Sequence, residues 1–127
     1  MKNKTCKHLE SIIQDTLEKI KADWNVNVYK QDKNYYAELE FNSHAGEDFV
    51  FDIWFDGTVE DFADNLWEYS QGFDPDEHAE MWVPSRGKNG VPSSIRALIR
   101  DAEDIQEELE TVAEKFRKEV ANHDEII

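Results

Sequence analysis

The side chains of this sequence that could do chemistry are mainly carboxylates, and they are concentrated in the middle of the chain. Between residues 34 and 85 the sequence has fourteen Asp and Glu residues and no Lys or Arg. A soluble surface normally intersperses both signs of charge. A block of one sign therefore predicts a negative surface that steers basic partners toward it, over a distance that salt limits to about 8 to 10 Å.

Eight of these carboxylates are predicted to point outward from strands and helices, where a partner could reach them. They are Glu38, Glu40, Asp52, Asp61, Asp64, Glu68, Asp74 and Glu77. One interpretation is a mimic of the phosphate backbone that occupies the nucleic-acid-binding groove of a basic protein. The other is an acidic, solvated surface that has no partner. The sequence leaves both interpretations open.

Four aromatic residues fall outside the predicted core positions, namely Tyr36, Trp54, Trp67 and Trp82. Aromatic side chains inside a charged rim are typical of the residues that dominate the binding energy of protein interfaces. The alternative is that they border the core and are covered by the loop over residues 83–94.

Other kinds of chemistry have little support. The acidic stretch 74–80 departs from the spacing of a calcium-binding loop. His44 and Glu47 also lack the spacing of a metal site, so we expect no metal. The loop 87–90 lacks the order and spacing of a phosphate-binding loop. Cys6 lies on an apolar stripe, so we expect it to be buried rather than nucleophilic. No nucleophile, base and orienting group stand together, and we expect neither enzyme activity nor a cofactor.

A β-hairpin over residues 35–55 is expected to position the first of the carboxylates. Apolar and polar residues alternate on both sides of a polar, glycine-containing break, which is the pattern of two antiparallel strands. Helices would cover the apolar face, and Glu38, Glu40 and Asp52 would point to water. A short strand over residues 24–29 extends the pair to a three-stranded antiparallel meander.

Helices are predicted on either side of the meander. Apolar residues at helical spacing indicate a first helix from a cap at Thr5 to about Asp23. A second helix begins after a cap at Thr58 and is closed by Gly72 in a left-handed conformation. Asp74, which a proline follows, caps a short third helix.

The longest predicted element begins at Ile95, after a cap at Ser93 or Ser94. Its apolar positions alternate spacings of four and three, as in a coiled coil. About 27 residues at 1.5 Å each make a helix of roughly 40 Å. We expect its first half to cover the sheet and its second half to project and pair with another copy. That dimer contact would use Leu109, Val112, Phe116 and Val120.

Length and composition predict one α+β domain over residues 1–127. The chain is 39% hydrophobic and long enough to bury a core without disulfides or a structural metal. Its 29 acidic and 14 basic residues give a net charge of −15, which argues against nucleic acid and anionic membrane as direct partners. One cysteine, and no run of the roughly 18 apolar residues that a transmembrane helix needs, predict a reduced, cytoplasmic setting.

Two segments carry a resemblance to known proteins. Residues 73–78, Phe-Asp-Pro-Asp-Glu-His, and residues 87–96, Gly-Lys-Asn-Gly-Val-Pro-Ser-Ser-Ile-Arg, resemble small acidic proteins of unknown function encoded on phages, plasmids and conjugative elements of Gram-positive bacteria. The resemblance runs from about residue 49 to residue 116. It implies a mobile genetic element, and such elements often encode small acidic inhibitors of host restriction or CRISPR nucleases.

Two functions are therefore predicted. The first is a non-enzymatic protein whose eight carboxylates bind the basic surface of a DNA- or RNA-binding protein, such as a restriction or CRISPR nuclease. The alternative is a homodimeric assembly module that uses the long helix, with the acidity serving solubility.

Overall fold

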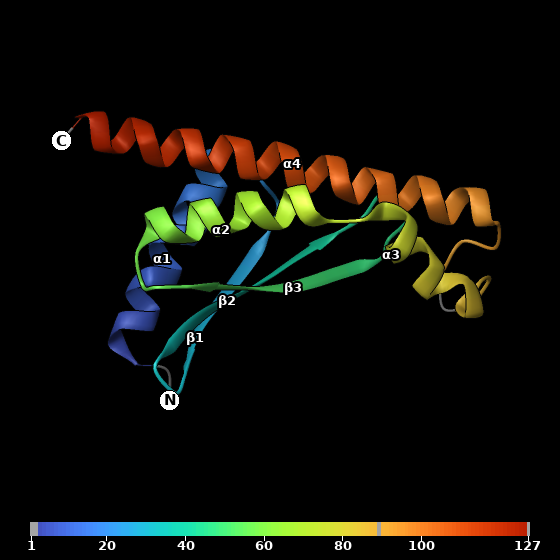
Figure 1. Ribbon diagram of the computed structural model, residues 1–127, viewed down its shortest axis with the longest axis horizontal. Helices are drawn as coiled ribbons and strands as arrows, with labels where there is room; N and C mark the ends of the chain where they lie inside the picture. The colour runs from blue at the N-terminus through green and yellow to red at the C-terminus, as the bar shows by residue number, and fades with distance from the viewer. Residues whose placement is uncertain (1–2, 89, 127) are drawn as a thin grey trace.

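The computed structural model describes residues 3–88 and 90–126, with side chains to residue 122, and this part of the chain folds into four α-helices and one sheet (Figure 1). In chain order the elements are α1 (Lys4–Lys19), β1 (Asn25–Gln31), β2 (Asn34–Asn42), β3 (Asp48–Phe55), α2 (Val59–Gly72), α3 (Pro75–Trp82), the 3-10 turn η1 (Val83–Ser85) and α4 (Ile95–Ile126). The predicted α+β order is confirmed. Asn89, which the sequence places in the loop before α4, lies outside the described residues. Within the described chain, no helix combines the length and the apolar character needed to cross a bilayer.

The sheet has the strand order β1-β2-β3, and both pairs are antiparallel as predicted. Its side chains alternate because successive residues of a strand point to opposite faces. Along β3, Phe49, Phe51, Ile53 and Phe55 are buried and the residues between them are exposed. Figure 1 shows α2 and α4 on the same side of the sheet. None of the described helices covers the other side, which therefore faces solvent.

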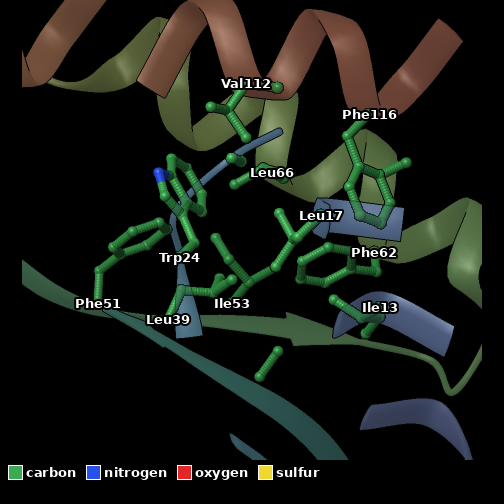
Figure 2. Close-up of a cluster of buried hydrophobic side chains, with 14 of the residues drawn as sticks. Ile13, Leu17, Trp24, Leu39, Phe51, Ile53, Phe62, Leu66, Val112 and Phe116 are labelled. Carbon is green, nitrogen blue, oxygen red and sulfur yellow. The ribbon is translucent and has the colours of Figure 1, made fainter. Parts of the chain in front are cut away.

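The main core fills the space between the sheet and helices α1, α2 and α4 (Figure 2). Trp24, which precedes β1, stacks on Phe41 of β2 with ring centroids 4.8 Å apart. Phe62 of α2 meets Phe116 of α4 edge to face at 5.2 Å. Such pairs contribute about 0.5 to 1.5 kcal/mol beyond the area that they bury. Cys6 is buried in this core, as predicted.

From Leu109 to Val120, α4 does not project from the molecule, and this part of the prediction is wrong. Leu109, Val112 and Phe116 have at most 4% of their surface exposed, and Val120 packs against the same core. This half of α4 instead packs on α2, where the ring of Phe62 contacts both Phe55 of β3 and Phe116 of α4. The four side chains expected at a dimer contact therefore belong to the core of a single chain.

The first half of α4 also differs from the prediction, because it packs on α3 instead of the sheet. Leu98 and Ala102 of α4 join Ala79 of α3 in a second, smaller cluster. The helix begins as predicted after Ser94, whose Oγ accepts a hydrogen bond from the backbone N–H of Ala97 at 3.1 Å. α4 thus joins the two ends of the molecule along its full length (Figure 1).

Two predicted helix caps are confirmed, at the starts of α2 and α3. Thr58 Oγ1 accepts a hydrogen bond from the N–H of Asp61 at 3.2 Å. Asp74 Oδ1 accepts hydrogen bonds from the N–H groups of Asp76 and Glu77 at 3.0 and 3.3 Å. These bonds satisfy donors that the first turn of a helix leaves unpaired.

The expected cap of α1 at Thr5 is wrong. Asn3 caps this helix, with its Oδ1 accepting a hydrogen bond from the N–H of Cys6 at 2.8 Å. The helix also ends earlier than predicted, at Lys19, because Lys21 adopts a left-handed conformation with φ of 62°. That conformation turns the chain back toward β1.

The expected left-handed Gly72 is also wrong. α2 includes Gly72, which is not among the residues of the described chain with a positive φ. The helix ends because Phe73 adopts an extended conformation, with φ of −69° and ψ of 127°. The ring of Phe73 then packs edge to face on Phe49 at 5.7 Å, so tertiary packing takes the place of the expected local cap.

Candidate protein-binding face

The side of the sheet that points away from the helices is the candidate functional site. The register of β1, β2 and β3 aligns its side chains in three rows, one of them aromatic and the other two sharing three carboxylates. We call these nine residues the outer face; row by row they are Tyr29, Tyr36 and Trp54, then Asn27, Glu38 and Asp52, then Asn25, Glu40 and Val50. The two tyrosines are half-buried and the other seven side chains are exposed.

The carboxylates of the outer face lie close together. Glu38 and Asp52 are opposite each other on β2 and β3, where facing Cβ atoms are about 4.5 to 5.5 Å apart. Glu40 follows Glu38 on the same face of β2, at about 6.7 Å. Like charges that face each other destabilise a sheet. The outer face contains no Lys or Arg, so a cation from outside would relieve this repulsion.

The aromatic row provides flat, partly exposed rings beside these charges. Tyr29 and Tyr36 stack with ring centroids 5.3 Å apart and planes at 16°, and Trp54, opposite Tyr36, is 50% exposed. Loss of hydration raises the pKa of the Tyr29 phenol, and the charges of Asp52 and Glu38 and a hydrogen bond to Asp52 raise it further. Tyr29 therefore reaches across the sheet to the carboxylates.

The free edge of β1 is covered by α1. Glu10 Oε1 accepts a hydrogen bond from the N–H of Val28 at 2.8 Å, and Gln14 Oε1 accepts one from the N–H of Val26 at 3.2 Å. An exposed strand edge is a template on which another chain can add a strand. These two contacts use donors that such a strand would need.

The edge of β3 is held in a similar way by α2. Asn65 Nδ2 donates to the backbone oxygen of Trp54 at 2.7 Å, and Asp61 Oδ2 accepts from the N–H of Asp56 at 2.9 Å. Helix side chains therefore bond to part of each edge of the sheet, at Val26 and Val28 of β1 and at Trp54 of β3, whereas no described helix packs on the outer face.

The three predicted carboxylates of α2 have a different role from those of the sheet. Asp61 supports the chain before the helix through the contact with Asp56. Asp64 Oδ1 lies 3.5 Å from Arg117 Nε of α4. Glu68 is exposed on the same helix. Two of the three therefore have partners elsewhere in the chain, Asp61 at Asp56 and Asp64 at Arg117. All three lie on α2 and not on the outer face.

The last two predicted carboxylates lie at the start of α3. Asp74 is the cap of that helix, and Glu77 is exposed in its first turn. The eight predicted residues are thus divided among the sheet, α2 and α3. The structure brings only Glu38, Glu40 and Asp52 together on one uncovered face.

The four aromatic residues singled out from the sequence are divided in the same way. Tyr36 and Trp54 lie on the outer face. Trp67 packs against the main core, and the guanidinium carbon of Arg117 lies 5.3 Å from its ring centroid. Trp82 packs against the smaller cluster, so for it the border interpretation is confirmed.

Among the polar contacts that sequence reasoning missed is one between the tip of the β2–β3 hairpin and α3. His78 Nε2 lies 2.9 and 3.2 Å from the two carboxylate oxygens of Glu47, and the rings of Phe49 and Phe73 are each 5.4 Å from the imidazole. Only 12% and 16% of the His78 and Glu47 side chains are exposed. No local spacing connects residues 31 positions apart, so this signal exists only in the folded chain.

Among the residues that the structure describes, no group of three or more His, Cys, Asp or Glu side chains is placed to hold a metal ion. Comparison of the chain with protein-family models, with curated proteins and with solved structures finds no match. The functional argument therefore depends on the outer face itself.

Proposed function

We propose that this chain is a non-enzymatic binding protein whose outer face engages a basic surface of another protein. One observation carries the proposal: Glu38 and Asp52 lie beside a row of partly exposed aromatic rings, and Glu40 lies one row further along, with no basic residue, on the side of the sheet that the described helices leave open. Rings that lose water at the centre of a charged rim are the usual anchors of a protein interface. The rim selects partners of opposite charge.

A protein that binds nucleic acid is the partner class that this face fits best. Such proteins concentrate Lys and Arg on one surface. A net charge of −15 attracts that surface and repels nucleic acid and anionic membrane. A restriction or CRISPR nuclease, the class implied by the resemblance to proteins of mobile elements, has a positively charged channel of this kind.

The division of the eight carboxylates favours a compact contact over an extended copy of a phosphate backbone. Asp61, Asp64 and Asp74 already serve the fold, so the proposed contact uses only the outer-face carboxylates and their aromatic neighbours. The proposed setting is the cytoplasm, where nucleic-acid-binding partners are found and where the single, buried Cys6 stays reduced.

The test compares two variants of equal charge in a pull-down from a Gram-positive bacterial lysate. The first carries Glu38→Gln, Glu40→Gln and Asp52→Asn, which neutralise the outer face. The control carries Glu80→Gln, Glu103→Gln and Glu107→Gln, which remove three exposed charges from α3 and α4.

We expect the native chain and the control to retain a basic, nucleic-acid-binding protein that the outer-face variant loses. Salt should weaken retention because the contact is electrostatic. Added DNA or RNA should release the partner, since both would compete for one surface. Equal retention by both variants, or retention that nucleic acid does not affect, would contradict the proposal.

A further inference from the structure

A partly exposed tryptophan lies near a carboxylate on the α2–α4 surface and again on the outer face, and on the first of these surfaces an arginine lies over the ring. On the α2–α4 surface, the Arg117 guanidinium lies 5.3 Å from the ring centroid of Trp67, and its Nε is 3.5 Å from Asp64 Oδ1. The cation thus combines a ring face with a carboxylate. This is the arrangement in which a cation–π contact and an ion pair support each other.

The outer face has the same two kinds of group but no cation of its own. Trp54 and Asp52 lie two residues apart on the same side of β3, and Tyr36 and Glu38 are opposite them on β2. These four side chains form a block with two rings at one end and two carboxylates at the other. Trp54 is half exposed, so its ring is accessible from solvent.

The shape of this block favours a guanidinium over an ammonium. A guanidinium is planar, stacks on rings, and has N–H donors in a fixed fork that matches carboxylate oxygens. An ammonium is a compact, strongly hydrated point charge that gains less from a flat ring. Facing Cβ atoms about 5 Å apart place both carboxylates within reach of a single fork.

We propose that the outer face binds an arginine side chain of the partner protein, with the guanidinium over Trp54 and Tyr36 and its N–H groups donating to Asp52 and Glu38. This inference rests on the proposed function and narrows it, because it identifies the partner residue that the face selects. Arginine-rich surfaces are common in proteins that bind nucleic acid.

A second copy of the chain is a poor occupant of this face. Two outer faces brought together would place carboxylates against carboxylates in a molecule with a net charge of −15, and like charges at an interface oppose association. Glu10 and Gln14 of α1 also occupy two N–H groups that edge-to-edge pairing of β1 would need, and Asn65 of α2 occupies one carbonyl of β3. A basic partner has the opposite charge, and it can bind the outer face without pairing with a strand edge.

The experiment titrates the ¹⁵N-labelled protein with two peptides of equal charge, acetyl-(Arg)₆-amide and acetyl-(Lys)₆-amide, at low salt. The chain has four tryptophans, and the Trp54 indole signal is assigned by its loss in Trp54→Phe. We expect the arginine peptide to shift this signal and the backbone signals of Tyr36, Glu38 and Asp52. It should bind about two- to fivefold more tightly than the lysine peptide.

Three variants separate the ring from general packing. Trp54→Ala should reduce the affinity for the arginine peptide to that for the lysine peptide, whereas Trp54→Phe should retain part of the preference. Val50→Ala is the matched control, because Val50 is also 50% exposed on the same side of β3. Thermal unfolding of each variant establishes that it is folded.

The outcomes distinguish this inference from the proposed function. Equal affinities for the two peptides on the outer face, or a preference that survives Trp54→Ala, would overturn the arginine inference and leave a basic-partner function standing. Shifts confined to other surfaces, or no binding, would overturn both. A preference lost equally in Val50→Ala would also count against a guanidinium stacked on Trp54.

Discussion

The α2–α4 surface and the outer face each have a partly exposed tryptophan near a carboxylate, and they differ in whether the chain supplies a cation. On the α2–α4 surface, the chain supplies the cation itself, as Arg117 approaches Trp67 and Asp64. On the outer face, Trp54 and Asp52 lie among strands whose outward positions contain no basic residue. The same pair of side chains therefore stabilises the fold in one place and is available to a partner in the other.

The difference follows from the number of layers on each side of the sheet. Helices packed on the inner side bring residues from distant parts of the chain into contact, and α4 carries Arg117 to α2 in this way. No described helix packs on the outer side, so the charged groups there come only from the strands. The net charge of that surface is therefore the sum of the charges on its outward strand residues.

The largest effect is expected in the core beneath Arg117, because this core holds α4 against α2 and so keeps Arg117 beside Trp67 and Asp64. Phe116→Ala should lower the free energy of unfolding by about 3 to 5 kcal/mol, because it removes a fully buried ring between α4 and α2. Urea unfolding measures this, and Lys115→Ala, at an exposed neighbouring position, is the control. If Phe116 instead formed a dimer contact, native stability would rise with protein concentration and sedimentation would show a dimer that Phe116→Ala dissociates.

A cation built into the outer face should make it resemble the α2–α4 surface. Val50→Arg places a guanidinium beside Asp52 on β3 and opposite Glu40 on β2. It should weaken binding of acetyl-(Arg)₆-amide at least about tenfold, because the new guanidinium pairs with the carboxylates of the outer face and repels the cationic peptide. Isothermal titration calorimetry measures this, with Val50→Ala as the control; unchanged affinity would mean that the peptide binds elsewhere.

Removing Arg117, the cation that the chain itself supplies on the α2–α4 surface, should lower stability and leave peptide binding unchanged. Arg117→Met keeps much of the apolar stem but loses the contacts with Trp67 and Asp64. Because these groups are partly exposed, we expect a loss of only about 0.5 to 1 kcal/mol in unfolding free energy. Peptide binding at the outer face should not change. Lys118→Met is the matched control, and equal losses in both variants would argue against a specific role for Arg117.

The smallest effect concerns Tyr29, whose raised pKa reports the negative charge beside it. Since the folded-state pKa lies above the unfolded value of about 10, the stability contributed by neutral Tyr29 is present below that pH and is lost as pH rises through the folded-state pKa. Asp52→Asn should lower the pKa of Tyr29, whereas Glu40→Gln, the control, should change it less. Absorbance titration at alkaline pH, with Tyr29→Phe to assign the transition, measures this; equal effects of the two substitutions would contradict the contact with Asp52.

Much of the fold could be predicted because its signals are short in range. Alternation along residues 35–55 defined the two central strands, and the caps at Thr58 and Asp74 defined two helix starts, since each depends on neighbours within three residues. The prediction failed at the start of α1, where Asn3 and not Thr5 is the cap, at Gly72 and in the packing of α4. At Gly72 and along α4 the outcome depends on packing between distant segments.

Only part of the candidate site could be predicted. Period-two alternation placed Glu38, Glu40 and Asp52 on one side of the sheet, as observed. The same reasoning also included Asp61 and Asp64, because a sequence does not show that an outward carboxylate already has a partner. Their contacts with Asp56 and Arg117 appear only when α2 and α4 are in place.

The sequence by itself determined which residues form strands and helices and which side of each is apolar, because periodicity and capping act over a few neighbouring positions. The tertiary structure alone decided which carboxylates gain a partner within the chain. It brought Arg117 to Asp64 and His78 to Glu47, and it left the outer face without a cation. Coulomb interactions depend on distance in space, and residues far apart in sequence reach such distances only when the core has assembled.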